Sequence, residues 1–271
     1  MESANISTTP NLGGAVVKIV FAILGVVAIY YLYKYLFIET KKNVVLVDKP
    51  MKARESKVIS PASMPIFVEG GEYTLSFWIY IQDMVHNNGI QKHVMTLGSP
   101  LAASTGFESI AVYLGATQPS LHIRTQNKDI PGASPTSTTA HLTTANVTEL
   151  FNNKTSFVTT DIRSADIPII DMQRWVNVTI VLNGRTTDVY MDGKLIRSSV
   201  NEGVLRVPST GYQLELGYKE GFGGYISRLQ AFDYALNPEE AYRIYTNGPH
   251  GPLSALDWLR SIFSPSEISV A

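Results

Sequence analysis

Residues 175–195 alternate between apolar and polar side chains, and this alternation constrains the fold more than any other stretch. In the first half of the stretch, the apolar side chains fall on one face of a strand and the polar ones on the other. Asn183-Gly184 follows, the dipeptide that most readily supplies two positive φ values, so we expect a hairpin. Asp192-Gly193 is another turn signal and predicts a third antiparallel segment. Three such segments cannot bury one face alone, so the pattern predicts a second sheet packed over them.

A second long strand is predicted at Tyr73–Gln82, where both faces carry large side chains and both are expected to be covered. Shorter strands are expected at His93–Leu97, Ile110–Leu114 and Leu121–Thr125, separated by Gly, Pro and Ser. This series is typical of an all-β fold, an antiparallel sandwich of two sheets. The side chains expected in its core are Trp78, Val178, Ile180, Val189 and Leu216.

The order of the motifs between residues 174 and 246 resembles that of a laminin-G-like domain. The motifs are a Trp that opens an apolar strand, an Asn-Gly turn, Val189-Tyr-Met-Asp-Gly-Lys-Leu195, Leu214-Glu-Leu-Gly217 and the stretch from Phe222 to Glu240. Such domains belong to the concanavalin A-like lectin and glucanase superfamily, so the resemblance implies a two-sheet jelly roll. It implies no single function, because the superfamily includes lectins, adhesion modules, glycanases and structural proteins.

Residues 13–38 are apolar on every helical face and follow a polar tail, residues 1–12. We expect one transmembrane helix here. Its uncharged core, Ile19–Tyr33, is shorter than the roughly 20 residues that a spanning helix needs, but Lys18 and Lys34 can snorkel to the interfaces. Four tyrosines near its C-terminal end are typical of an aromatic belt. A cleaved signal peptide is the alternative, although the start lacks a basic region and a small-residue cleavage site.

Basic side chains gather after this helix, since residues 34–57 hold seven Lys and Arg against three Asp and Glu. We assign residues 39–65 to a basic juxtamembrane linker and residues 66–252 to the laminin-G-like sandwich. The positive-inside rule then predicts a single-pass protein whose C-terminal domain lies on the cytosolic side, or outside an inner membrane in a virion.

Two compositional features limit the partners and the compartment. The chain has no cysteine, which favours a reducing compartment and excludes zinc-thiolate sites and cysteine nucleophiles. Its formal net charge of −1 argues against nucleic acid as a partner. Sequons at Asn146, Asn153 and Asn177 would be glycosylated only if the domain were exported, which is the opposite topology.

Two stretches outside the strands are candidates for binding surfaces. Gln126–Ser156 is rich in Thr, Ser, Asn and Pro, and we interpret it as a long surface loop, either functional or unstructured. Asn237-Pro-Glu-Glu240 predicts a capped short helix that ends at Asn247-Gly248-Pro249. Residues 253–271 are expected to form an amphipathic helix, Ser254–Phe263, and a tail. That helix would dock on its own sandwich, on a partner protein or on a membrane.

The sequence offers no catalytic or metal site. Glycanases of this superfamily carry a Glu-x-Asp-x-x-Glu strand, and no such string occurs here. The five histidines have no metal-ligand spacing, so we expect no cofactor and no metal. The Asp83–Asn88 turn is only a candidate for a calcium site. The glycine-rich stretch from Gly217 to Gly224 lacks the phosphate-loop ending and is interpreted as tight turns.

Two functional hypotheses remain. The first is a non-catalytic, membrane-anchored tether between membrane lipid and a neighbouring structural protein, similar to the membrane-anchored laminin-G-like proteins of large DNA viruses and hence a minor capsid or virion membrane protein. The second is a surface lectin or adhesion receptor that binds a glycan and requires the opposite topology.

Overall fold

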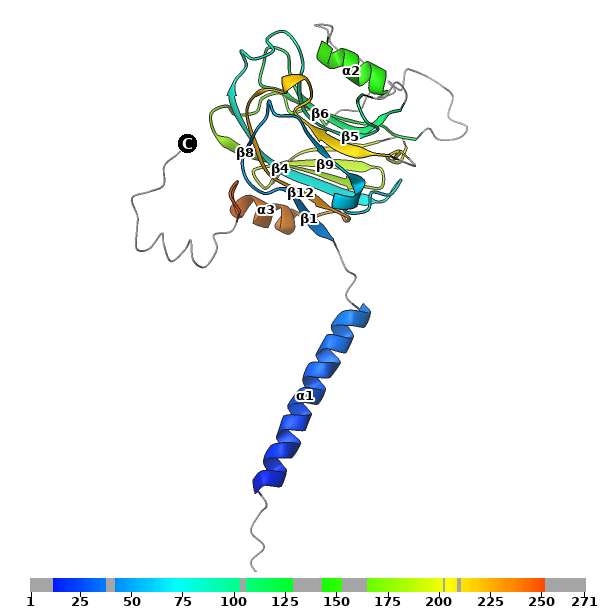
Figure 1. Ribbon diagram of the computed structural model, residues 1–271, viewed down its shortest axis with the longest axis vertical. Helices are drawn as coiled ribbons and strands as arrows, with labels where there is room; N and C mark the ends of the chain where they lie inside the picture. Colours follow the sequence, from blue (N-terminus) through cyan, green and yellow to red (C-terminus); the bar gives the residue numbers. More distant parts are fainter. Residues whose placement is uncertain are drawn as a thin grey trace, which may run out of the picture. The chain divides into compact units, whose positions relative to one another are not determined.

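The computed structural model describes residues 12–37, 42–102, 106–128, 143–152, 165–201, 203–208 and 211–251. These residues fall into two units, one within residues 1–41 and the other within residues 42–271. Figure 1 shows the first as a single helix and the second as a β-sandwich. The expected helix Ser254–Phe263 lies outside the described residues.

The first unit is helix α1, Leu12–Phe37, which has 26 residues and confirms that the apolar stretch is helical. Large apolar side chains between Ile19 and Tyr33 are exposed all along it. Within the part of the chain described here, no helix combines the length and apolar character that crossing a membrane requires.

The second unit is an antiparallel sandwich of two sheets, as the alternation of Trp175–Leu195 predicts (Figure 1). The seven-stranded sheet has the order β1-β12-β4-β8-β9-β10, and β2 also pairs with β12. The five-stranded sheet has the order β3-β11-β5-β6-β7. The strands of the first sheet are β1 (Asn43–Val47), β2 (Met51–Lys52), β4 (Glu72–Asp83), β8 (Trp175–Asn183), β9 (Thr186–Met191), β10 (Lys194–Val200) and β12 (Gly223–Phe232). Those of the second are β3 (Lys57–Ile59), β5 (Lys92–Gly98), β6 (Glu108–Leu114), β7 (Leu121–Thr125) and β11 (Gln213–Leu216).

The main core lies between the two sheets and takes side chains from the inner face of both. Strand β4 is covered on both faces: Phe77 and Ile79 point into this core, whereas Trp78 packs on the outer side beneath a helix. The five side chains expected in the interior are all buried, which confirms the register of the alternation.

The turns of the central hairpin differ in one detail from the expectation. Asn183 pairs with Thr186, so the two-residue turn is Gly184-Arg185, and only Gly184 has a positive φ, 58°. The turn with two positive φ values is Asp192-Gly193, at 50° and 73°. The expectation that Asn183-Gly184 supplies both values is wrong, because Asn183 remains the last residue of β8.

The sandwich begins earlier than the charge pattern indicates. Residues 43–59, which fall in the expected basic linker, instead form β1, β2 and β3, the first and third of which are edge strands. Lys52 of β2 and Lys57 of β3 are both exposed. Residues 38–42 are therefore all that separate α1 from β1.

Two helices cover the outer faces of the sheets. Helix α2, Thr144–Asn152, contacts β6 and buries Val147, Leu150 and Phe151, so the expectation of a continuous loop from Gln126 to Ser156 is wrong at this helix. Helix α3, Pro238–Thr246, has the predicted capping box, in which Asn237 and Glu240 exchange hydrogen bonds. The 3-10 turns η1, Pro61–Ser63, and η2, Tyr218–Glu220, complete the described elements.

Candidate functional site: an apolar groove between two edge strands

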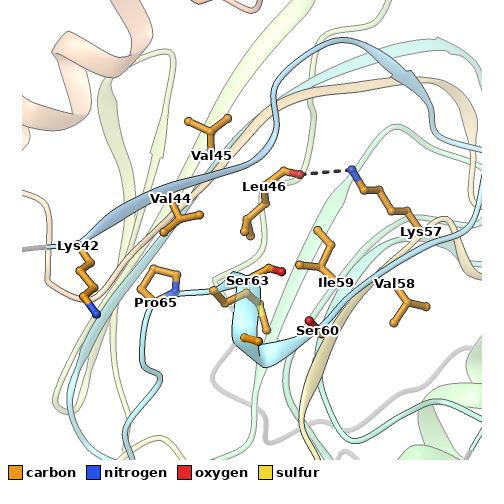
Figure 2. Close-up of a pocket in the computed structure, with 12 residues that line it drawn as sticks. Lys42, Val44, Val45, Leu46, Lys57, Val58, Ile59, Ser60, Ser63 and Pro65 are labelled. Carbon is orange, nitrogen blue, oxygen red and sulfur yellow. Dashed lines mark hydrogen bonds between the residues drawn. The ribbon is translucent and has the colours of Figure 1, made fainter.

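A groove opens along the side of the sandwich where β1 and β3 end their sheets (Figure 2). Strand β1 pairs with β12, and β3 pairs with β11. Among the described residues neither strand has a partner on its other side. Two unpaired backbone edges, one from each sheet, therefore flank the same opening.

The groove has a volume of about 720 Å³, and its lining is mostly aliphatic. Val45 and Val58 belong to the lining and are 41% and 55% exposed, whereas Ile59 and Met64 are buried. The polar side chains in the lining are Lys42, Lys57, Ser60 and Ser63; the other lining residues are Val44, Val45, Leu46, Val58, Ile59, Ala62, Met64 and Pro65.

Lys57 connects the two edges of the groove. Its Nζ donates a hydrogen bond to the carbonyl oxygen of Leu46, at 3.3 Å, and so joins β3 to β1 (Figure 2). With Lys42 exposed at the start of β1, the groove has two ammonium groups and no carboxylate among its lining residues. The lining of the groove is therefore apolar apart from two serines and two positively charged lysines.

Close backbone packing fixes the turn between β2 and β3. The turn after β2 passes close to the glycine-rich stretch, where a Cβ on Gly217 would lie 2.3 Å from the carbonyl oxygen of Glu55 and one on Gly221 would lie 2.2 Å from that of Ala53. Both glycines have positive φ, at 65° and 43°. The glycine-rich stretch therefore serves close backbone approach beneath β3, in line with its interpretation as turns.

The sequons lie in unlike environments. Asn177 is fully buried in β8, where its Nδ2 donates to the carbonyl oxygen of Phe77 at 3.3 Å. The folded domain therefore hides Asn177 from a glycosyltransferase. Asn146 is half-buried on α2, and Asn153 lies outside the described residues.

The Asp83–Asn88 turn uses its polar atoms internally. The Oδ1 of Asp83 accepts from the backbone N–H of Val85 and of His86, and the Nδ2 of Asn87 donates to two carbonyl oxygens near η2. Within the described residues no group of three or more His, Asp or Glu side chains has the geometry of a metal site. The turn thus joins β4 to η2, and no calcium role is assigned to it.

Sequence reasoning missed the groove residues entirely. The lining of the groove comes from a stretch interpreted as a linker, and the available signal was the short apolar run of residues 44–47, bounded by Asn43 and Asp48. Asp166, which no sequence motif singled out, pairs with His122 and Arg124 beside β7.

The sequence pattern of one family matches most of the sandwich. Residues 55–241 match the concanavalin A-like lectin/glucanases superfamily, a span of more than half of the chain. No curated protein matches the chain.

Solved structures with a similar backbone path have low sequence identity to this chain. The botulinum neurotoxin serotype D binding domain has 12% identity and a TM-score of 0.47, over 79% of this chain and 50% of that one. The Ruminococcus gnavus IT-sialidase CBM40 bound to sialyllactose has 13% identity and a TM-score of 0.49, over 74% of this chain and 99% of that one. The chain spans about half the length of the toxin domains that it matches.

These likenesses are too distant to assign a ligand, but the family match and the two-sheet topology agree with each other. The chain belongs to the concanavalin A-like lectin/glucanases superfamily.

Proposed function

We propose that this protein is a non-catalytic binding module that tethers a membrane to a neighbouring protein layer, and that the β1–β3 groove is its protein contact. The observation that carries the proposal is the lining of the groove, which is aliphatic apart from two lysines and two serines. An exposed apolar surface of this kind, rimmed by polar groups, is typical of a protein interaction site.

The lining favours a protein segment over a glycan. A sugar carries many hydroxyl groups, and each that leaves water needs a hydrogen-bond partner. The groove offers only four polar side chains among the twelve that line it. An aliphatic peptide segment with one or two acidic residues matches this surface better, since Lys42 and Lys57 can meet the carboxylates.

The backbone edges favour an extended partner. Strands β1 and β3 each have one side without a partner among the described residues, and an edge of that kind accepts an added strand from another chain. Main-chain hydrogen bonds would supply affinity, and alternate apolar side chains would enter the groove.

The anchor in this proposal is α1, in which Lys18 and Lys34 lie near the two ends of the uncharged core Ile19–Tyr33. The support is the sequence pattern of residues 13–38 and the exposure of large apolar side chains along the helix. The basic excess after the helix favours a cytosolic sandwich, or one outside the inner membrane of a virus particle, where the protein would be a minor capsid or virion membrane protein. Only residues 38–42 separate α1 from β1, and such tethering would raise the effective concentration of the sandwich for a partner beside the membrane.

Substitution at the groove tests the proposal. Val58 is exposed on β3, so Val58→Asp should leave the fold intact and abolish recovery of the protein neighbour by cross-linking in intact membranes. Val85, which is 80% exposed outside the groove, provides the matched control Val85→Asp, which should keep the neighbour. Equal recovery by both variants contradicts the groove contact. A lectin is the alternative that the family allows, and specific binding of the full chain to a glycan array, unchanged by Val58→Asp, would favour it.

A further inference from the structure

Ser120, His122 and Asp166 come together at the β7 edge of the five-stranded sheet, the opposite edge from β3 and the groove. Ser120 precedes β7 and His122 lies within it, two residues apart and hence on one face of the chain. Asp166 comes from a later segment, which is fixed beside β7 because Leu121 and Ile167 exchange two backbone hydrogen bonds of 2.9 Å. We call these three side chains the Ser120 relay.

The imidazole of His122 lies between the other two members of the relay. Its Nε2 is 2.9 Å from the Oγ of Ser120, and its Nδ1 is 3.1 Å from the Oδ2 of Asp166. The second contact has ion-pair distance, although the Nδ1–H direction does not point straight at the carboxylate. Ser120 is half-buried, and the Asp166 side chain is 29% exposed.

Neighbouring side chains hold this arrangement in place. Arg124 donates to both carboxylate oxygens of Asp166, one bond being 3.0 Å long. Tyr113 stacks on the His122 ring, with centroids 5.1 Å apart and an interplanar angle of 21°. Burial raises the pKa of Asp166, but hydrogen bonds from His122 and Arg124 outweigh it and hold that pKa below its usual range. Asp166 therefore stays ionised.

An ionised carboxylate beside Nδ1 favours the tautomer that carries its proton on Nδ1. The lone pair of Nε2 then faces the Ser120 hydroxyl, which donates to it. This is the arrangement by which a base activates a serine for nucleophilic attack.

We propose that Ser120 is a covalent modification site, at which the relay accepts an acyl group from an activated ester. The Oγ of Ser120 forms a bond to the carbonyl carbon and its proton passes to Nε2 of His122. The tetrahedral adduct then expels the ester's alkoxide or phenoxide by breaking the carbon–oxygen bond, and His122 returns the proton to that leaving group. The products are acyl-Ser120 and a free alcohol or phenol, with no change in oxidation state.

The surrounding backbone favours a stable adduct over rapid turnover. The N–H of Ser120 donates to the carbonyl oxygen of Gln118 and that of Leu121 donates to Ile167, so neither of these amides is available to an oxyanion. Loss of a single oxyanion donor slows acyl transfer by about 10²- to 10³-fold in serine hydrolases. The relay therefore fits a slow acceptor site, which is compatible with a binding module.

Acetylation of the full chain by p-nitrophenyl acetate tests the proposal. We expect release of one equivalent of p-nitrophenolate per chain, a mass increase of one acetyl group, and a fragment map that places it on Ser120. Ser120→Ala should abolish this modification. Ser198→Ala removes an exposed hydroxyl that bonds to Asp188 on another strand, and it should leave the Ser120 modification unchanged.

Variants of His122 separate base assistance from a structural role. His122→Gln should slow acetylation of Ser120 by about 10²-fold or more. In His122→Ala, added imidazole should restore part of the rate, which a merely structural histidine would not allow. Acetylation confined to lysines, or an unchanged rate in both His122 variants, overturns the proposal. Neither outcome bears on the groove, so the two proposals fail separately.

Discussion

The rings of Trp78 and Tyr245 stack with their centroids 5.8 Å apart and an interplanar angle of 20°. Trp78 belongs to β4, at the centre of the large sheet, and Tyr245 belongs to α3, near the C-terminal end of the described chain. This contact fastens α3 to the outer face of the sheet, and α3 also buries Ala241 in a small cluster with Leu236 and Phe232.

Removal of this stack should loosen α3. Tyr245→Ala is expected to lower the free energy of unfolding by about 1 kcal/mol or more, because an aromatic pair contributes about 0.5–1.5 kcal/mol beyond the area it buries. Denaturant unfolding measures the loss. Tyr242→Ala, on the same helix and more exposed at 54%, should cost less. A larger loss from Tyr242→Ala would show that the stack does not fix the helix.

A core substitution tests the strand register. Ile180 is fully buried in β8, paired with Leu75 on one side and Val189 on the other. Ile180→Ala should lower the free energy of unfolding by about 2–5 kcal/mol through loss of contacts and a cavity. Val85→Ala, at an 80% exposed position, should change it by less than about 0.5 kcal/mol. Equal stability of the two variants would show that Ile180 does not face the core.

Because of the buried carboxyl group of Glu108, the free energy of unfolding should fall as the pH rises. Burial, with Glu215 adding to it, raises the pKa of Glu108 to about 9 from its ordinary value of 4.5. Between these two values the unfolded chain has lost a proton that the folded chain retains. Unfolding is therefore increasingly favoured as the pH rises, by up to about 1.4 kcal/mol per pH unit from this group.

Glu108→Gln removes this dependence while keeping the side-chain shape. The variant should gain stability relative to the parent as the pH rises through that window, measured by denaturant unfolding at its two ends. Glu239→Gln changes an exposed carboxylate in the first turn of α3 and should show no such trend. A constant difference between Glu108→Gln and the parent across the window would mean that Glu108 is ionised in the fold.

The proposed topology rests on the basic side chains after α1. In sealed microsomes, added protease should digest the sandwich, and Asn146 and Asn153 should carry no glycan, because the proposed orientation is cytosolic. Detergent-opened vesicles give the control for protease activity. A protected and glycosylated sandwich would contradict the tether and would favour a surface receptor.

Short sequence patterns predicted those strands and helices whose formation depends on residues close together in the sequence. The apolar alternation placed β4 and the β8–β9–β10 meander, and the Asn237 to Glu240 motif placed the start of α3. Helix α2 could have been predicted, because Val147, Leu150 and Phe151 have helical spacing. The abundance of Thr and Asn around them instead indicated a loop.

The edge strands and both proposed sites could not be predicted in the same way. Strands β2 and β3 carry the exposed Lys52 and Lys57, and together with the lysines before β1 these residues resemble a juxtamembrane linker in sequence. Leu46 and Lys57 face each other only because the two sheets end on the same side. His122 and Asp166 are 44 positions apart in the sequence (166 − 122), and the bridge between Leu121 and Ile167 brings them together.

Site-specific photo-cross-linking tests the central claim most directly. A photoreactive side chain at Val58 of the full-length chain, activated in intact membranes or particles, should attach one defined protein, whereas the same group at Val85 should not. An excess of the unsubstituted chain, which keeps Val58, should reduce the yield of cross-linked product by competition. An excess of the Val58→Asp variant should not reduce it. Attachment of the same proteins from both positions, or of none while the full chain binds a glycan specifically, would contradict a groove that receives a protein partner.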